Sequence, residues 1–471
     1  MNWQYKPSLL ALSVILLSAC ASQPTHHERV VELETVPSAW QQLPSGDKVL
    51  AVEDNWLQQL HDPQVFTLVE QALTYNQAIL QAGYDVAIKE QQLIAAGADL
   101  WPSLDLSTRA SRSKGNRPVN YNNASSASLE LSYEVDLWGK LSSSERQANL
   151  EYLAEKATFS QSKQQLVADV VSGWFDVITN QKLLELYKQR EQNAEQNLSI
   201  IESGYRQGLN EALDVYLARN ELNTERSNIA AQQATLTKSI RDLERLTGQY
   251  PTGALSVSAD LPLLENTIPL GLPSELITRK PELMASWYQL LSTDAGLAYA
   301  HKQRFPSLNL SASISDSTDR MSDLFSPSSL AWSLIGSISM PLFEGGRLKA
   351  NEEQARLNVK RQEQAYLATL YDAFNDVETA ISQEQALKVR YEKTLEAQEN
   401  AIAAERLSFE QYQSGLVTYT TVLDAQDRSF NAQSSVIELK NQLIKNRINL
   451  HIALGGDFSA ANSEVKSNNH E

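Results

Sequence analysis

The sequence of 471 residues contains a single cysteine, Cys20, and only six histidines. One cysteine excludes a disulfide framework and any metal cluster built on cysteines. The histidines are scattered, and the chain has no glycine-rich phosphate loop, no His-Glu zinc motif and no nucleophile elbow. We therefore predict that the protein is not an enzyme and has no catalytic residues, no metal site and no cofactor.

Proline and glycine are also scarce, with 15 and 18 residues respectively. No proline lies between Pro118 and Pro251 or after Pro341, so two windows of about 130 residues lack the strongest helix breaker. Positive charge is in deficit as well, and the net charge of -17 opposes binding to a nucleic-acid backbone. Long helices and no nucleic-acid partner are therefore expected.

The N-terminal residues 1–19 have the build of a signal peptide, since Lys6 precedes an apolar stretch that ends in small residues. The segment is too short to span a bilayer permanently. The tetrad Leu-Ser-Ala-Cys that ends at Cys20 resembles the bacterial lipobox. That resemblance implies a lipoprotein with acyl chains, palmitate among them, on Cys20, and Ala21 as the next residue implies sorting to the outer membrane.

The chain repeats itself at an offset of about 204 to 207 residues. Three motifs recur in the same order: WPSL at 101–104 as FPSL at 305–308, LWGK at 137–140 as LF and GR within 342–347, and YRQGL at 205–209 as YQSGL at 412–416. This order indicates a tandem duplication. The predicted parts are a signal peptide (1–19), a lipid-anchored linker (20–62), a first repeat (63–255), a connection (256–271), a second repeat (272–456) and a disordered tail (457–471).

Strand patterns occur at matching places in the two repeats. Over 128–137, and again over 308–315 and 332–340, apolar residues alternate with Ser, Glu, Asp or Asn, as in a strand with one apolar face. The segments 112–125 and 316–329 are polar and rich in Ser or Asn, so we expect them to be loops between paired strands of about ten residues. Each repeat should therefore hold one pair of strands.

The remaining segments predict helices. Each repeat should begin with a helix of about 35 residues and, after the strands, contain a very long helix, a glycine break and another helix. From Gly139 to about Gln207 the long helix could extend roughly 100 Å. Its narrow apolar stripe predicts partner helices. That stripe consists of Val167, Val170, Val171, Trp174, Val177 and Ile178.

Alternating strands of this length match segments of transmembrane β-barrels, and the mature chain has no apolar run long enough for a membrane helix. Four strands cannot close a barrel, because the smallest known membrane barrels have about eight. The barrel would have to be shared among chains, and the strand count alone permits either a dimer or a trimer. A soluble four-stranded sheet packed on helices is the alternative, but it would require a helical cover over the apolar face.

Several motifs together resemble the outer membrane factor family of efflux channels, in its OprM- and CusC-like lipoprotein branch and more distantly TolC. They are Trp56, Asp62-Pro63, YEVDLWGK at 133–140, PLFEGGRLKA at 341–350 and ALGG at 453–456. The resemblance covers nearly the whole mature chain. It implies a mainly α fold with a small transmembrane β part, in which a homotrimer shares a 12-stranded β-barrel and long coiled helices form an α-barrel through the periplasm.

The same resemblance implies the exit duct of a tripartite efflux pump, anchored in the outer membrane, that passively conducts drugs or other small toxic solutes. Its implied partners are a periplasmic adaptor (membrane fusion) protein and an inner-membrane transporter of the resistance-nodulation-division type. Gly208-Leu209 and Gly415-Leu416 break the two long helical patterns at matching points, where glycine permits a left-handed turn. By resemblance these hairpin tips dock the adaptor.

Just beyond the second tip, Asp424 and Asp427 lie three residues apart and hence on one helical face. By resemblance this stretch, with Thr420 and Thr421, forms the periplasmic aperture, where a ring of carboxylates would attract cations. Asp427 departs from OprM-like members, which often have Arg there, and Thr421 departs from TolC-like members, which have a second Asp.

The barrel lumen should be lined by Glu130, Glu134 and Asp136, if the strand alternation is read in the right register.

Two other functions stay open. An exit channel for type I protein secretion is disfavoured by the lipobox, and a lipoprotein coiled-coil tether in the periplasm would not need duplicated alternating strands.

Overall fold

The computed structural model describes residues 36–41, 52, 54–60, 62–116, 119–257, 260–263, 268–324 and 330–458. The predictions for the signal peptide, for Cys20, for most of the linker and for the tail beyond residue 458 lie outside these residues.

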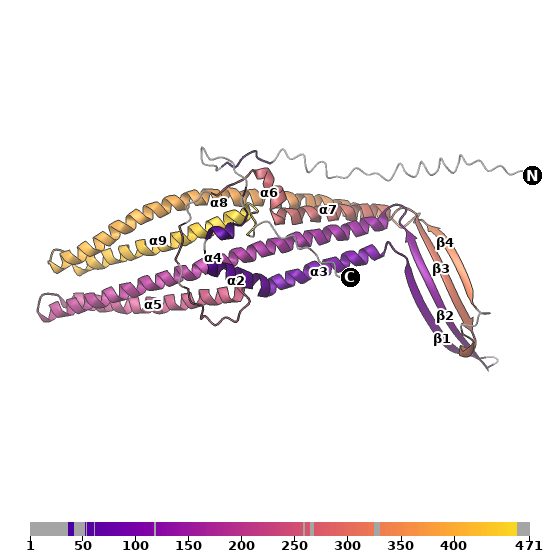
Figure 1. Cartoon of the computed structure of the whole chain (residues 1–471), viewed down its shortest axis with the longest axis horizontal. Helices are drawn as coiled ribbons and strands as arrows, with labels where there is room; N and C mark the ends of the chain where they lie inside the picture. Colours follow the sequence, from indigo (N-terminus) through magenta and orange to yellow (C-terminus); the bar gives the residue numbers. More distant parts are fainter. Residues whose placement is uncertain are drawn as a thin grey trace, which may run out of the picture. The chain divides into compact units, whose positions relative to one another are not determined.

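The tandem duplication predicted from the motifs is visible in the order and length of the elements (Figure 1). The first repeat contains η2 (Trp56–Leu60), α2 (Pro63–Tyr75), α3 (Gln77–Ala98), β1 (Ser103–Asn116), β2 (Val119–Val135), α4 (Lys140–Arg206) and α5 (Ala212–Leu246). The second contains α6 (Pro273–Arg279), α7 (Pro281–Lys302), β3 (Ser307–Thr318), η3 (Met321–Asp323), β4 (Ala331–Ser339), α8 (Arg347–Gln413) and α9 (Tyr419–Ala453). Helices α4 and α8 both have 67 residues, and α5 and α9 both have 35. The prediction of a mainly α, tandem-repeat fold with four strands is confirmed.

The single helix of about 35 residues predicted at the start of each repeat is wrong, because a break divides it. In the first repeat the break is at Asn76, whose Oδ1 accepts from the backbone N of Ala78 at 2.9 Å and so caps α3. In the second repeat Lys280 precedes Pro281 and takes an extended backbone, since proline disfavours a helical residue before it. The two repeats thus reach the same bend by different residues.

The four strands form one antiparallel sheet in the order β1-β2-β3-β4. Its register confirms the predicted alternation, since polar and apolar rows follow one another across all four strands. One row consists of Asp105, Glu130, Ser313 and Ser333, and the next consists of Leu106, Leu129, Ile314 and Trp332.

The loop predicted at 112–125 is also wrong. Strands β1 and β2 have 14 and 17 residues, and their pairing continues to Asn116 and Val119. Serine and asparagine fit this part of the sheet because backbone pairing holds the hairpin together. In addition, the Arg112 guanidinium on β1 lies 4.9 Å from the centre of the Tyr121 ring on β2. In the second repeat β3 ends at Thr318 and β4 begins at Ala331, close to the predicted loop.

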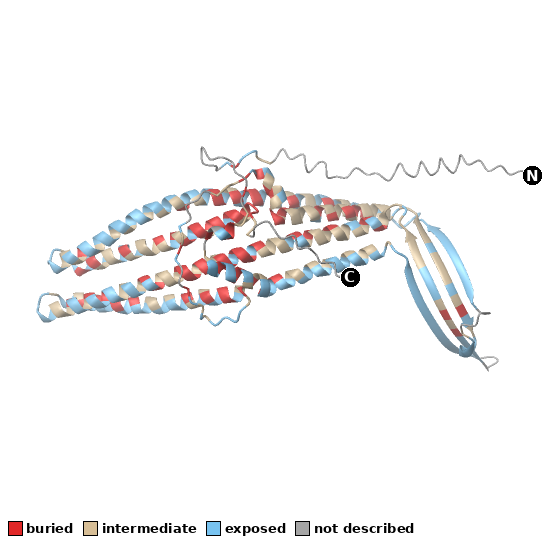
Figure 2. Ribbon diagram, in the orientation of Figure 1, coloured by how far each residue is buried: buried red, intermediate tan, exposed pale blue. Residues whose placement is uncertain are grey.

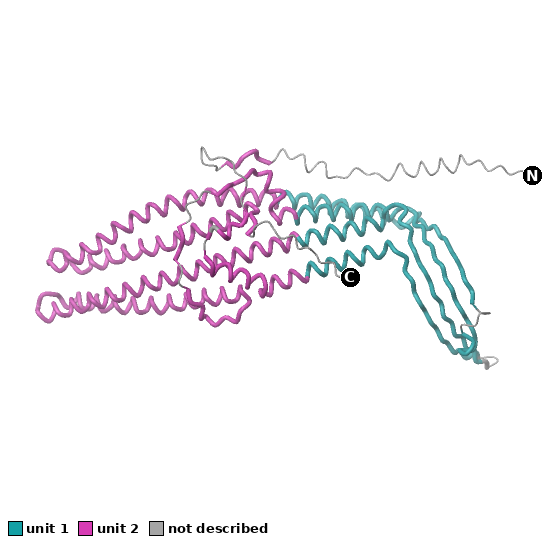
Figure 3. The backbone as a smooth tube through the Cα atoms, viewed as in Figure 1, with its two compact units in different colours: residues 1–35, 85–156, 285–368 teal, residues 36–84, 157–284, 369–471 magenta. Residues whose placement is uncertain are grey.

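The described residues divide into two compact units, each of which draws residues from both repeats (Figure 3). Unit 1 consists of residues 85–156 and 285–368, and unit 2 of residues 36–84, 157–284 and 369–458 within the described ranges. Unit 2 holds the large apolar core seen as buried residues in Figure 2, and the predicted stripe of α4 from Val167 to Ile178 is buried in it. In unit 1 a smaller cluster joins α7 to α8 through Leu290, Leu297, Val359 and Tyr366.

None of the helices in the described ranges is both long and apolar enough to cross a membrane.

Candidate functional site

The first hairpin tip joins α4 to α5 by a turn that requires glycine. Gly208 has φ +77°, a left-handed conformation that other residues adopt only with strain. The backbone N of Leu209 donates to Gly204 O at 2.9 Å, and the N of Gly208 donates to Tyr205 O at 3.0 Å. These two bonds form a Schellman motif, which satisfies carbonyls at the end of α4.

The second tip, between α8 and α9, repeats this geometry. Gly415 has φ +72°. Leu416 N donates to Gln411 O, and Gly415 N donates to Tyr412 O, both at 2.9 Å. Leu209 and Leu416 are exposed, and a Cβ added to either glycine would meet no atom within 4 Å. Each chain therefore presents two equal turns with an apolar side chain that its own fold leaves uncovered.

Just behind the tips, the two hairpins contact each other within unit 2. The Tyr412 hydroxyl donates to Asp214 Oδ2 at 2.8 Å, which links α8 to α5. Burial, together with this bond to Asp214, raises the pKa of Tyr412. A small apolar cluster surrounds the bond and includes Ile201, Val215, Ala218, Tyr419 and Val422. Sequence reasoning missed this link, because Tyr412 and Asp214 are 198 residues apart and no motif joins them.

The two threonines predicted at the aperture lie in the first turn of α9. The Oγ1 atom of Thr418, the residue that precedes this helix, lies 2.7 Å from that of Thr420 and 3.3 Å from that of Thr421. Both predicted threonines are exposed. Their hydroxyls therefore help to shape the start of the helix that follows the second tip.

The aspartates predicted at the aperture are each matched by an arginine. Asp424 Oδ2 lies 3.0 Å from Nε of Arg428, one turn further along α9, and both side chains are exposed. Asp427 Oδ1 lies 2.5 Å from Nη2 of Arg190 on α4. The predicted acidic face is therefore part of a mixed-charge surface within each chain.

Arg190 is the centre of a charge cluster that joins three helices. Besides Asp427 on α9, it contacts Glu221 Oε1 at 2.7 Å and Glu225 Oε1 at 2.8 Å, both on α5, and its guanidinium lies 4.8 Å from the Phe430 ring centre. Glu225 is buried, and burial raises its pKa to about 7 despite the opposing charge of Arg190. From sequence alone, Arg190 is one cation among many on a polar helix face, so the cluster was not predicted.

The three residues predicted to line a barrel lumen differ in their surroundings. Glu130 and Glu134 belong to the polar face of β2, opposite Ser313 and Asn309 of β3. Asp136 lies beyond the end of β2, and its carboxylate accepts from the backbone N atoms of Leu141 and Ser142, both at 2.9 Å. The alternation of the strand therefore does not extend to Asp136, which stabilises the start of α4.

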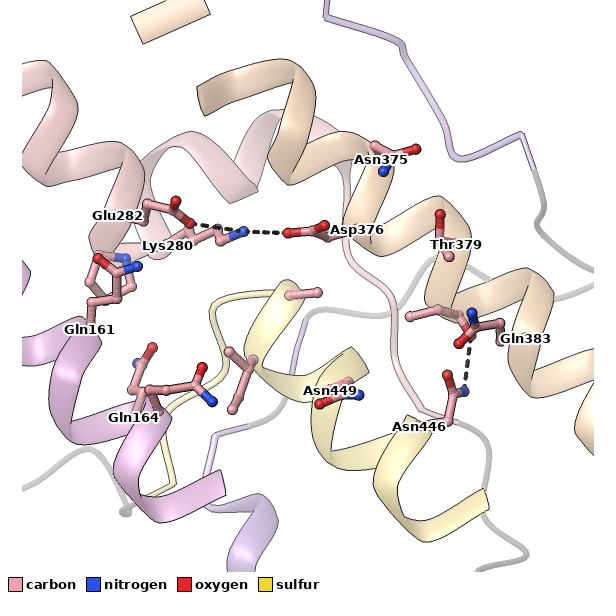
Figure 4. Close-up of a pocket in the computed structure, with 15 residues that line it drawn as sticks. Gln161, Gln164, Lys280, Glu282, Asn375, Asp376, Thr379, Gln383, Asn446 and Asn449 are labelled. Carbon is pink, nitrogen blue, oxygen red and sulfur yellow. Dashed lines mark hydrogen bonds and ion pairs between the residues drawn. The ribbon is translucent and has the colours of Figure 1, made fainter. Parts of the chain in front are cut away.

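A polar cavity of about 340 Å³ lies in unit 2 between α4, α7, α8 and α9 (Figure 4). Lys280 extends between Glu282 and Asp376 and lies 3.3 Å from a carboxylate oxygen of each. Amide side chains form much of the remaining wall, and Asn446 donates to the backbone O of Ala380 at 3.0 Å. The residues described include no cluster of three or more His, Cys, Asp or Glu that could hold a metal ion.

The sequence matches the model of a protein family described as outer membrane efflux protein over residues 68–249 and 272–456. Among curated proteins, it is 28% identical over 469 residues to the probable outer membrane lipoprotein SilC of Salmonella typhimurium, covering 96% of this chain and 99% of the relative. It is 28% identical over 404 residues to the cation efflux system protein CusC of Escherichia coli, covering 84% and 87%. It is 26% identical over 466 residues to the probable efflux pump outer membrane protein TtgC of Pseudomonas putida, covering 95% of each chain.

Solved structures of channels share this fold. The outer-membrane channel OprN superposes with a TM-score of 0.85 at 22% identity and covers 93% of this chain and 100% of its own. A structure of CusC gives a TM-score of 0.80 at 24% identity, with 90% and 99% covered. VceC of Vibrio cholerae gives 0.80 at 24% identity, with 87% and 100% covered.

Proposed function

The chain belongs to the outer membrane efflux protein family, and from this premise we propose that three copies form the exit duct of a tripartite pump, with their hairpin tips docked on a periplasmic adaptor. The protein is an efflux channel of the outer membrane. The finer proposal is a passive conduit for small toxic solutes, driven by an inner-membrane transporter of the resistance-nodulation-division type.

The observation that carries the docking proposal is the equality of the two tips. Leu209 and Leu416 occupy the same place in two Schellman turns, and the described part of the chain leaves them 77% and 74% exposed. Three copies would present six such tips in a ring. A partner with repeated apolar docking sites would fit this arrangement, because exposed leucines gain free energy when a partner removes them from water.

The cargo is proposed only as a class. The relatives are named for cation, antibiotic and toluene efflux, which indicates that one fold of this kind serves chemically different solutes. We propose that the transporter selects the solute and that the duct conducts what it receives. We further propose that Asp424 and Asp427 lie near the narrow periplasmic end, and that Glu130 and Glu134 face the lumen of the barrel.

The anchor is part of the same proposal. A covalent lipid on Cys20, which lies outside the described residues, would hold the N-terminal linker at the membrane. Two or more acyl chains give stable anchoring.

The docking proposal is tested by changing both tip leucines, Leu209→Ser with Leu416→Ser. The host is a Gram-negative strain that lacks its own exit channel but keeps its adaptors and transporters, and the readout is accumulation of a fluorescent efflux substrate. The expected result is loss of efflux while the channel remains trimeric in the membrane, since both changed side chains are exposed in the described fold. Leu263→Ser, at an exposed leucine in the connection between the repeats, is the matched control and should keep efflux. Full efflux by the tip variant in a host that accepts the native channel would overturn the docking proposal.

A further inference from the structure

The two repeats meet in unit 1, where strand β2 of the first repeat pairs with strand β3 of the second. At the end of this pairing, Val135 lies opposite Leu308. Three residues beyond each, Trp138 packs against Phe305 with ring centres 5.4 Å apart, and its Nε1 donates to Pro306 O at 2.7 Å. The corner of the first repeat is thereby joined to the corner of the second.

The equivalent aromatic pair at the outer edges of the repeats has no such contact. By the motif alignment, Phe343 corresponds to Trp138, and Trp101 corresponds to Phe305. Trp138 and Phe305 are half-buried, whereas Phe343 is 90% exposed and Trp101 is 76% exposed. The chain therefore carries both halves of a second aromatic contact, but on opposite edges.

The helices of unit 1 show the same difference between inner and outer positions. Leu150 on α4 is 8% exposed, while its repeat counterpart Leu357 on α8 is 56% exposed. Ser292 on α7 is 1% exposed, while its counterpart Ile88 on α3 is 53% exposed. An isolated chain thus leaves apolar side chains in water at positions whose equivalents are buried, which is typical of surfaces that a partner covers.

The outer strands of the sheet are likewise left without a partner on one side in the described part of the isolated chain. Strands β2 and β3 are paired on both sides, but β1 and β4 end the four-stranded order. Unpaired edges of long strands, 14 residues in β1 and 9 in β4, are templates for pairing with another chain. Since β4 corresponds to β2 and β1 to β3, the β2–β3 junction is a template for a β4–β1 junction between copies.

We propose that Phe343 of one copy packs against Trp101 of the next, so that the outer edges of neighbouring chains reproduce the internal Trp138–Phe305 junction. The partner is a second copy of this chain, because the chain itself contains the surface that fits each edge. This inference rests on the proposed homotrimer and deepens it by naming the contact that closes the ring of repeats. Membrane lipid is the other candidate to cover Phe343 and is distinguished by the test.

The test uses the full-length channel with Trp101→Cys and Phe343→Cys. Both positions lie just beyond the paired strands, where the internal counterparts pack with ring centres 5.4 Å apart, so cysteines there should lie within reach of a short bismaleimide cross-linker. This cross-linker should move most of the chain from the monomer band to bands of two and three chains on a denaturing gel. The controls are the two single variants and the native chain, whose one cysteine is Cys20. Each control should give at most a dimer band, and the double variant should give several-fold more cross-linked product.

A matched pair controls for reactivity. Trp138→Cys with Phe305→Cys reproduces the internal junction, so the cross-link should close within one chain and leave the chain in the monomer band. A second pair, Ile88→Cys with Asn358→Cys, corresponds to the internal contact between Ser292 Oγ and Glu151 Oε1 at 3.5 Å. A short bismaleimide should join that pair between chains.

The oligomeric mass and bilayer conductance of the same samples separate the outcomes. Trimers that conduct, but in which neither pair joins chains, would overturn the inference and leave the proposed function standing. Quenching of a fluorophore on Phe343→Cys by spin-labelled lipid in such trimers would assign the position to the membrane and also overturn it. A protein that is monomeric and never conducts would contradict the proposed function itself.

Discussion

The two ends of the α-hairpins have the same backbone turn but opposite surroundings. Just after the ends of helices α5 and α9, Gly248 and Gly455 make the Schellman bonds that are also present at Gly208 and Gly415. A Cβ on Gly248 would overlap the backbone of Tyr75, and one on Gly455 would lie 2.9 Å from the backbone of Arg279 and Lys280. At the tips the same Cβ would meet nothing within 4 Å.

This difference separates folding from function. The base glycines are required twice, by the left-handed backbone and by the close approach of another segment. The tip glycines are required only by the turn. A duplicated turn whose glycine has open space beside it is therefore available to a partner, whereas at the base another segment of the chain fills that space.

The largest effect on folding is expected at the partly buried charge cluster around Arg190. Arg190→Ala leaves the buried Glu225 and the partly buried Glu221 without their cation, and we expect a cost of about 3 kcal/mol, the lower end of the range for a buried ion pair, because Glu225 can take up a proton. Arg428→Ala, which removes the exposed partner of Asp424, should cost less than about 1 kcal/mol. Thermal unfolding of both variants in detergent, followed by circular dichroism, checks this order. Equal midpoints would contradict this role of Arg190.

The next largest effect is expected from alanine substitutions that compare the folding free energy at Gly248 with that at Gly208. Gly248→Ala combines left-handed strain with overlap of the Tyr75 backbone and should cost about 3 kcal/mol of folding free energy. Gly208→Ala carries only the strain, about 1 kcal/mol, and its trimers should persist. The same unfolding measurement, with trimer yield from membranes, gives both values. A tip variant as unstable as the base variant would remove the distinction between the two ends.

A smaller effect on the free energy of unfolding, which depends on pH, is expected at the buried His451 in the last turn of α9. Burial lowers the pKa of His451 to about 4, and its ring stacks on Trp56 at 5.7 Å between centres. A histidine in the unfolded chain binds a proton near pH 6.5, whereas the buried, neutral His451 does not do so until about pH 4. The stability that neutral His451 contributes to the folded state is therefore fully present above pH 6.5 and is lost as the pH falls toward 4. At pH 5 the loss should be about 2 kcal/mol.

His451→Phe keeps a ring beside Trp56 but cannot take up a proton. Its unfolding midpoint should therefore depend less on pH between 6.5 and 4 than that of the native protein. An unchanged pH profile would show that other groups cause the acid sensitivity.

Much of the fold could be predicted because its signals are local or repeated. The proline-free windows predicted α4 and α8, the alternation of Leu with Ser and Glu predicted the faces of the sheet, and the repeated glycines predicted the tips. The break at Asn76 was missed because it depends on a side-chain cap within an otherwise helical pattern. The length of β1 and β2 was missed because Ser/Asn-rich segments are typical of loops.

The surroundings of the candidate site could be predicted only in part. Asp427 was found from its spacing to Asp424, but its partner Arg190 lies 237 residues away and belongs to another helix. The bond between Tyr412 and Asp214 also joins residues far apart in the sequence, at a separation of 198. Such contacts depend on how the helices pack, and a single sequence carries no local pattern for them.

The most direct test of the account is the planar-bilayer conductance of the purified full-length protein, with its oligomeric mass measured on the same sample. We expect a trimer that opens in discrete steps and prefers cations, as the net charge of -17 and the acidic residues of β2 predict. A monomer or dimer that passes no current would contradict the exit duct, and a trimer that prefers anions would contradict the assignment of Glu130 and Glu134 to its lumen.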